Sequence, residues 1–197
     1  MSKLKPLPDS ELKAFAPVFD MIKQVMGFVP NSTKTMARNP ALLSAFSQLG
    51  IEVMTKGNLP ADLKYLVSHI ASQANGCRYC QAHTIGLAER NGCSEEKLKS
   101  VWDFENSPAF EEKEKAALRF GLAAGSHPNS VTDRHFADLR EYFTEAEILE
   151  LGAIISFYGF LNRWNDTFGT PLELEATEHG HKYLKHQGWE IGKHTKD

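Results

Sequence analysis

Cysteine is scarce in this chain. Only three of its 197 residues are cysteines, and an odd number argues against the disulfide framework of a small secreted protein. The first 21 residues carry Pro6, Pro8 and three acidic residues where a secretory signal would have its apolar core. We therefore expect a cytoplasmic protein, in which a close cysteine pair more often serves catalysis or metal binding than structure.

A large excess of charge and long apolar runs are also absent. The formal net charge is -3, so the chain offers no basic face for nucleic acid or for an anionic membrane. The longest apolar stretch, residues 151–161, is too short to span a bilayer. We expect no nucleic-acid partner and no membrane partner.

Helical periodicity is what the sequence does contain. Apolar residues recur at spacings of three and four, and no segment alternates as a strand would. We predict an all-α fold in one domain. Its N-terminal helices lie at 10–56, its core at 59–125, a second helical half at 132–170 and a tail at 171–197.

Two helix starts are specified in more detail. Asp9 or Ser10 is expected to cap the first helix, which places Pro17 at an interior position where proline can kink it. Thr144 and Glu147 form a capping box ahead of a helix through residue 164. That helix is apolar on almost every side, which indicates a position at the centre of the fold or between subunits.

Two further patterns, a possible internal repeat and a histidine-rich tail, each allow a structural and a more specific interpretation. The order of signals in residues 59–84 resembles that in residues 143–166, through an internal duplication or by coincidence. The tail contains His179, His181, His186 and His194, and we expect it to be a solvated end segment rather than a metal site.

A C-x-x-C pair followed by histidine is the main functional signal. Cys77, Cys80 and His83 fall at i, i+3 and i+6 of an expected helix, with the first cysteine near its N-terminus. The helix dipole favours a thiolate there, and an imidazole can accept the thiol proton. We predict a redox dithiol with a proton relay and no bound cofactor.

Other interpretations of the pair stay open. A zinc site would need a fourth ligand, for which His69, Cys93 and His135 are candidates without diagnostic spacing. Two buried structural cysteines with a satisfied histidine are the plainest alternative.

Residues outside the motif are candidates on position alone. His69 and Tyr65 lie on the preceding expected helix and approach the thiols if the two helices form a hairpin. Asn162 and Arg163 end the apolar helix as a hydrogen-bonding cluster that either lines a pocket or pairs internally. Cys93 follows a helix stop and is interpreted as a lone thiol.

These segments together resemble a known family. Leu59-Pro60, the run 75–83, the Gly92 stop and the run 157–164 are similar to the carboxymuconolactone decarboxylase superfamily, in its alkylhydroperoxidase D-like, peroxidase-related branch. The resemblance covers about residues 40 to 170. It implies an alkylhydroperoxidase D-like helical bundle that forms a homo-oligomer and reduces hydroperoxides with its cysteine pair.

The resemblance also implies roles for individual residues. Cys80 is the cysteine attacked by peroxide, Cys77 resolves it, and His83 belongs to the relay. Two positions depart from the family pattern, because Thr84 stands at the usual histidine and Tyr65 at the usual glutamate. We therefore expect the relay to run through His83 and His69, with Tyr65 as a further member.

The sequence thus predicts an oxidoreductase, an antioxidant thiol peroxidase. It would reduce organic hydroperoxides and be regenerated by an external dithiol. A thiol-disulfide reductase or redox adaptor without peroxide chemistry is the first alternative. A zinc-binding protein and a cofactorless acid/base enzyme of the decarboxylase type are the others.

Overall fold

The computed structural model describes residues 2–196, and within them the chain is helical without strands, as predicted. The α-helices are α1 (Ala16–Met26), α2 (Asn31–Met36), α3 (Pro40–Thr55), α4 (Ala61–Ala74), α5 (Arg78–Arg90), α6 (Glu95–Ser100), α7 (Glu112–Gly125), α8 (Asp133–Arg140), α9 (Glu145–Phe168) and α10 (Leu174–Tyr183). Short 3₁₀ turns join several of them. Within residues 2–196, no helix has both the length and the apolarity needed to cross a bilayer.

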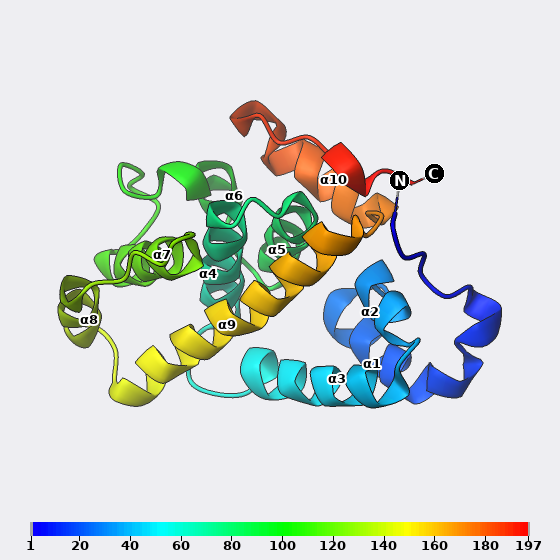
Figure 1. Ribbon diagram of the computed structural model, residues 1–197. Helices are drawn as coiled ribbons and strands as arrows, with labels where there is room; N and C mark the ends of the chain where they lie inside the picture. The colour runs from blue at the N-terminus through cyan, green and yellow to red at the C-terminus, as the bar shows by residue number, and fades with distance from the viewer. Residues whose placement is uncertain (1, 197) are drawn as a thin grey trace.

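Helix α4 is the centre of the fold. It packs against α5, α7 and α9, and every residue from 63 to 72 is buried. The long helix α9 crosses the molecule, with α4–α8 on one side and α1–α3 on the other (Figure 1). This arrangement places α4 and α5 against α9, with α1–α3 closing the space on its other side.

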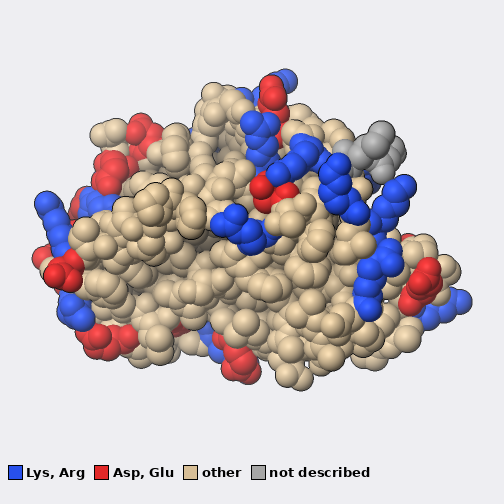
Figure 2. Space-filling view, in the orientation of Figure 1, with Lys and Arg blue, Asp and Glu red and all other residues tan. Residues whose placement is uncertain are grey.

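One face of α9 is open, so the helix is not buried all round. Leu149 is 75% exposed and Phe160 is 42% exposed. Figure 2, in the same orientation, shows a broad area with few charged side chains across this face. An apolar face of this kind suits contact with a second copy of the chain, and the expected homo-oligomer stays a prediction.

The N-terminal region departs from the predicted helix start. Two 3₁₀ turns occupy Asp9–Glu11 and Lys13–Phe15, and the α-helix begins only at Ala16. Pro17 therefore lies in the first turn of α1, where its missing N–H has no partner to lose. The expected kink was wrong for this reason. The capping box at the start of α9 is confirmed, with the Thr144 N–H donating to Glu147 Oε2 at 2.8 Å.

The prediction of a solvated tail was also wrong. Helix α10 packs on α5, and the segment after it returns to the body of the protein. The Trp189 indole donates to the Arg78 carbonyl at 3.1 Å, and its ring fills the space beside Gly180. His194 is 1% exposed, whereas His181 and His186 are exposed. Apolar residues spaced along this segment are buried against the body of the protein. The high histidine content of the segment had led to the prediction that it is solvated.

A buried ion pair fixes α4 to α9. Lys64 Nζ lies 2.5 Å from Glu150 Oε1, and the two side chains are 3% and 13% exposed. The ammonium also donates to the Val53 carbonyl at 3.1 Å, while Glu150 accepts from the Asn58 N–H at 3.0 Å. The pair therefore holds the turn between α3 and α4 as well as the two helices.

Removing one partner of this pair should be costly. We expect Glu150→Ala to lower the free energy of unfolding by about 3 kcal/mol, because it leaves a buried ammonium uncompensated. Urea unfolding measures the change. Glu145→Ala is the matched control on the same helix, since its pair with Arg140 is exposed and should be worth about 1 kcal/mol or less. Equal losses in the two variants would contradict this assignment.

Candidate active site

The turn between α4 and α5 sets the position of the two thiols. Gly76 has a φ of 79°, a left-handed conformation that reverses the chain after α4. Cys77 follows as the N-cap residue of α5, and its Sγ accepts the Cys80 N–H at 3.3 Å. Cys77 is fully buried and Cys80 is 2% exposed. Both cysteines are free thiols at the N-terminal end of the helix, as the sequence predicted.

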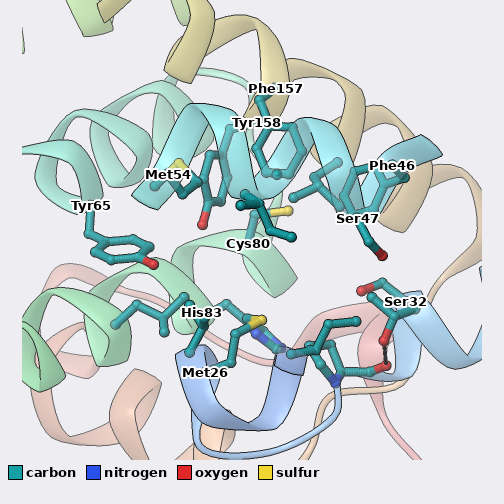
Figure 3. Close-up of a pocket in the computed structure, with 18 of the residues that line it drawn as sticks. Met26, Ser32, Phe46, Ser47, Met54, Tyr65, Cys80, His83, Phe157 and Tyr158 are labelled. Carbon is teal, nitrogen blue, oxygen red and sulfur yellow. Dashed lines mark hydrogen bonds between the residues drawn. The ribbon is translucent and has the colours of Figure 1, made fainter. Parts of the chain in front are cut away.

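A cavity of about 120 Å³ lies beside Cys80, between α1–α3 and the pair α5 and α9. Cys80 forms part of its wall and Cys77 does not. Figure 3 shows Cys80 and His83 facing the cavity, with Tyr65 on one side and Ser47 on the other. Its lining is largely apolar: Met21, Ile22, Val25, Met26, Phe46, Met54, Phe157 and Leu161.

The Cys80 sulfur has one polar neighbour from α9. Asn165 Nδ2 donates to Cys80 Sγ at 3.5 Å, and Asn165 is 1% exposed. Burial raises the pKa of the Cys80 thiol well above its ordinary value, the neighbouring Cys77 adds to the increase, and the Asn165 hydrogen bond opposes it. Cys80 is therefore protonated at neutral pH, and a base must take its proton before the sulfur can react.

The sequence did not single out Asn165 as a site residue. Asn162 and Arg163, on the same helix, were the predicted candidates. Asn162 is buried but does not line the cavity, and Arg163 is exposed to solvent. The apolar helix continues one turn beyond the expected end, to Phe168. That extra turn carries Asn165 to the sulfur, and an asparagine three residues after Asn162 was the available signal.

His83 is paired with a carboxylate from the tail. His83 Nε2 lies 2.7 Å from Glu173 Oε2, and the two residues are 6% and 7% exposed. The Tyr79 hydroxyl donates to Glu173 Oε1 at 2.9 Å, and the Tyr79 and His83 rings stack at 4.3 Å. The backbone N–H of Asn31 also donates to Glu173. Three elements, α2, α5 and the start of α10, therefore meet at one carboxylate.

Glu173 is ionised in this setting. Burial alone would raise its pKa, but the neighbouring His83, through its position and its hydrogen bond, and the Asn31 N–H together hold the pKa below its ordinary value. Sequence reasoning missed this residue because it lies 90 positions from His83 in a segment expected to be solvated. The absence of a glutamate at Tyr65 was the one hint that a carboxylate comes from elsewhere.

His69 is not brought into the relay. Its Nδ1 lies 3.2 Å from the Gln81 carbonyl and 3.1 Å from the Thr84 hydroxyl. The carbonyl can only accept, so Nδ1 carries the proton, and among the described residues the buried Nε2 has no hydrogen-bond partner. Across residues 2–196, no hydrogen bond of His69 reaches His83 or a cysteine. Burial lowers its pKa to about 4.

The remaining candidates are dispersed. Tyr65 lines the cavity and burial raises its pKa, so it is a neutral hydroxyl there. Cys93 is buried outside the cavity wall, and His135 accepts the Thr132 N–H at the start of α8. In the described part of the chain, no group of three or more His, Cys, Asp or Glu side chains is arranged to hold a metal ion.

A protein-family model and a known protein each match part of this chain. The model of the Carboxymuconolactone decarboxylase family matches residues 40–123. The chain is 32% identical over 112 residues to the uncharacterized protein YnjA of Escherichia coli strain K12, and the match covers 56% of this chain and 61% of YnjA. The alignment therefore spans less than two thirds of that relative.

Solved structures match over more of the chain. The debrominase Bmp8 is 33% identical with a TM-score of 0.86, covering 91% of this chain and 97% of Bmp8. A cysteine-to-alanine variant of Bmp8 in complex with 2,3,4-tribromopyrrole matches with a TM-score of 0.87. A peroxidase-related protein from Ralstonia eutropha JMP134, with an alkylhydroperoxidase AhpD core, is 25% identical with a TM-score of 0.75, covering 88% of this chain and 94% of that protein.

The buried neutral His69 predicts a loss of stability in acid. The unfolded chain takes up a proton near pH 6.5, whereas the folded protein does so only near pH 4. Stability therefore falls as the pH drops through this window, by roughly 2 kcal/mol between pH 7.5 and pH 5.0. We expect His69→Asn to remove that part of the loss, measured by urea unfolding at the two pH values. His186→Asn, at an exposed position, should leave it unchanged, and an unaltered pH dependence in His69→Asn would refute the assignment.

Proposed function

Since this chain belongs to the carboxymuconolactone decarboxylase superfamily, with the alkylhydroperoxidase D-like proteins, we propose that it is a thiol-dependent peroxidase for small organic hydroperoxides. One observation carries the proposal: Cys80 faces a small apolar cavity, whereas Cys77 does not line that cavity and accepts the Cys80 N–H on its sulfur. One sulfur is thus placed to meet the substrate and the other to meet only the first sulfur. This is the division of roles that a two-step dithiol cycle requires.

In the first step, Cys80 reduces the peroxide bond. The Cys80 sulfur attacks the terminal oxygen of R–O–O–H, the O–O bond breaks, and the alkoxide leaves. The thiol proton passes to His83 and from there to the alkoxide, which departs as the alcohol. Cys80 becomes a sulfenic acid and the substrate gains two electrons.

In the second step, Cys77 removes the sulfenic acid. The Cys77 sulfur attacks Cys80 Sγ, the S–O bond breaks, and the hydroxyl leaves as water after accepting the Cys77 proton. The product is a Cys77–Cys80 disulfide, which two electrons from an external thiol must reduce. The short approach of the two residues across the first turn of α5 favours this closure.

The ionised Glu173 supports His83 in the proton transfers. A carboxylate bound to one ring nitrogen orients the imidazole and stabilises the imidazolium that forms when the thiol proton arrives. This matters because burial raises the pKa of the Cys80 thiol, so the sulfur depends on a nearby base. In this proposal Glu173 is the carboxylate of the relay, a role that related proteins give to a glutamate at the position of Tyr65.

Reductive debromination is a second candidate, favoured by the similarity to Bmp8 along nearly the whole chain. The same two sulfurs would serve it. Cys80 would take bromine from a C–Br bond, the carbon would receive a proton, and Cys77 would displace bromide to give the same disulfide. The cavity of about 120 Å³ is slightly smaller than the cavity of roughly 150 Å³ that holds benzene, so a single ring is near the upper limit of its size.

Serine substitutions test the roles of the two sulfurs. We expect Cys80→Ser to abolish consumption of tert-butyl hydroperoxide, because its hydroxyl is a poor nucleophile. Cys77→Ser should allow one turnover and leave a sulfenic acid that a dimedone probe labels at Cys80. The matched control is Cys93→Ser, which removes a buried thiol outside the cavity and should keep turnover.

Assays of the wild-type protein with both substrates distinguish the two substrate classes. Bromide release from 2,3,4-tribromopyrrole, with no consumption of hydroperoxide, would replace the peroxidase assignment by debromination. Equal residual hydroperoxide turnover in Cys80→Ser and Cys77→Ser would rule out the dithiol cycle itself.

Loss of the Glu173 charge should slow the chemical step. We expect Glu173→Gln to lower kcat by roughly 10²-fold with little change in KM, the usual range for a proton-transfer partner. Tyr79→Phe is the comparison, because it removes one hydrogen bond to Glu173 and keeps the charge and the ring stack; its loss should stay below about tenfold. Steady-state kinetics with tert-butyl hydroperoxide, alongside thermal unfolding to verify the fold, measures both. Wild-type kcat in a folded Glu173→Gln variant would exclude Glu173 from the relay.

A further inference from the structure

The burial of the two sulfurs restricts which thiol can regenerate the dithiol. Thiol–disulfide exchange proceeds by attack of a thiolate on one sulfur of the disulfide, with the other sulfur as the leaving group. The attacking sulfur must therefore approach from the side opposite the leaving sulfur. For the disulfide of Cys77 and Cys80, the direction of approach decides which reductants are possible.

Attack on Cys77 has no route from solvent. Cys77 is fully buried and belongs to the main hydrophobic core cluster. Attack on Cys80 has one route, because Cys80 is 2% exposed and faces the cavity. The reductant must therefore place its sulfur inside the cavity, where the substrate was bound before.

Helix α1 forms one wall of the cavity. Ile22, Val25 and Met26 of α1 line it, and Figure 3 shows Met26 beside His83. The C-terminal end of α1 is held to α5 by the Arg90 guanidinium, which donates to the Gln24 carbonyl at 3.4 Å. A cysteine on the surface of a folded protein does not protrude far enough to cross a helix layer.

The size and lining of the cavity define the class of thiol. A volume of about 120 Å³ admits a compound of a few heavy atoms. The wall is largely apolar, and no lysine or arginine of residues 2–196 lines it, so a thiol carrying carboxylates would lose hydration without gaining a cationic partner. We propose that the reductant is an uncharged low-molecular-weight thiol that enters the substrate cavity, so that substrate and reductant occupy one site in alternation.

The proposal rests on the dithiol cycle proposed above, and its steps balance. The thiolate RS⁻ attacks Cys80 Sγ, forming a mixed disulfide and releasing the Cys77 thiolate, which takes up a proton. A second RS⁻ attacks the outer sulfur of the mixed disulfide and releases Cys80, which is protonated in turn. Two thiols are oxidised to RSSR, and the protein disulfide gains two electrons and two protons.

Reduction of the isolated disulfide form tests the proposal. The disulfide is formed with excess hydrogen peroxide, so the measurement does not depend on turnover of an organic hydroperoxide. Its reduction is followed by quenching with a maleimide and mass spectrometry. The reductants are 2-mercaptoethanol, glutathione and reduced thioredoxin, each with the folded protein and with the same disulfide unfolded in urea.

We expect 2-mercaptoethanol to reduce the folded protein at least about tenfold faster than glutathione at equal thiolate concentration, because glutathione must bring charge into the cavity. In the urea-unfolded chain the two should differ by less than about threefold, since only thiol nucleophilicity then matters. Toluene, a redox-inert occupant, should slow reduction of the folded form alone. Reduction of the folded protein by thioredoxin or glutathione at the unfolded rate would overturn the proposal.

This outcome is separable from failure of the peroxidase assignment. If tert-butyl hydroperoxide leaves the thiols reduced while the access pattern above is found, the proposed substrate class is wrong and the reductant inference stands. If hydroperoxide turnover is normal and thioredoxin reduces the folded disulfide freely, the peroxidase assignment stands and the shared cavity is wrong.

Discussion

One buried carboxylate joins the parts of the site. Glu173 accepts from Tyr79 on α5 and from the Asn31 N–H at the start of α2, and it pairs with His83. A buried charge is tolerated only when it is paired and hydrogen-bonded, so these contacts are required to keep it ionised. The same requirement fixes the tail against α5 and α2 against the tail. The cavity wall and the proposed proton relay therefore depend on the same residue.

The helical order could be predicted because each helix carries its own signals. The capping box at Thr144 is such a local signal, and it predicted the start of α9 correctly. Pro17 was misjudged because the apolar periodicity extends before it, although the chain there forms 3₁₀ turns. Local patterns do not distinguish a helix from a looser turn with similar spacing.

The site could be predicted only as far as it is contiguous in sequence. Cys77, Cys80 and His83 share one helix, so their spacing was sufficient. Asn165 and Glu173 reach them from 85 and 90 positions away, through packing that no local pattern encodes. His69 illustrates another limit: it lies against α5, but its ring is turned to the backbone of that helix. Long-range partners and side-chain direction are properties of the packed structure.

Burial gives the site both its chemistry and its limits. The low dielectric that raises the pKa of Cys80 also strengthens the pairing of His83 and Glu173, so in the proposed cycle thiolate formation is coupled to the relay instead of being permanent. A thiol that stays protonated until a substrate is present is protected from adventitious oxidation, because the thiolate is the reactive form. The cost is access, since Cys80 is 2% exposed and lines the cavity. The proposed reactivity, protection and choice of reductant thus share one basis, the position of one sulfur in the wall of a small apolar space.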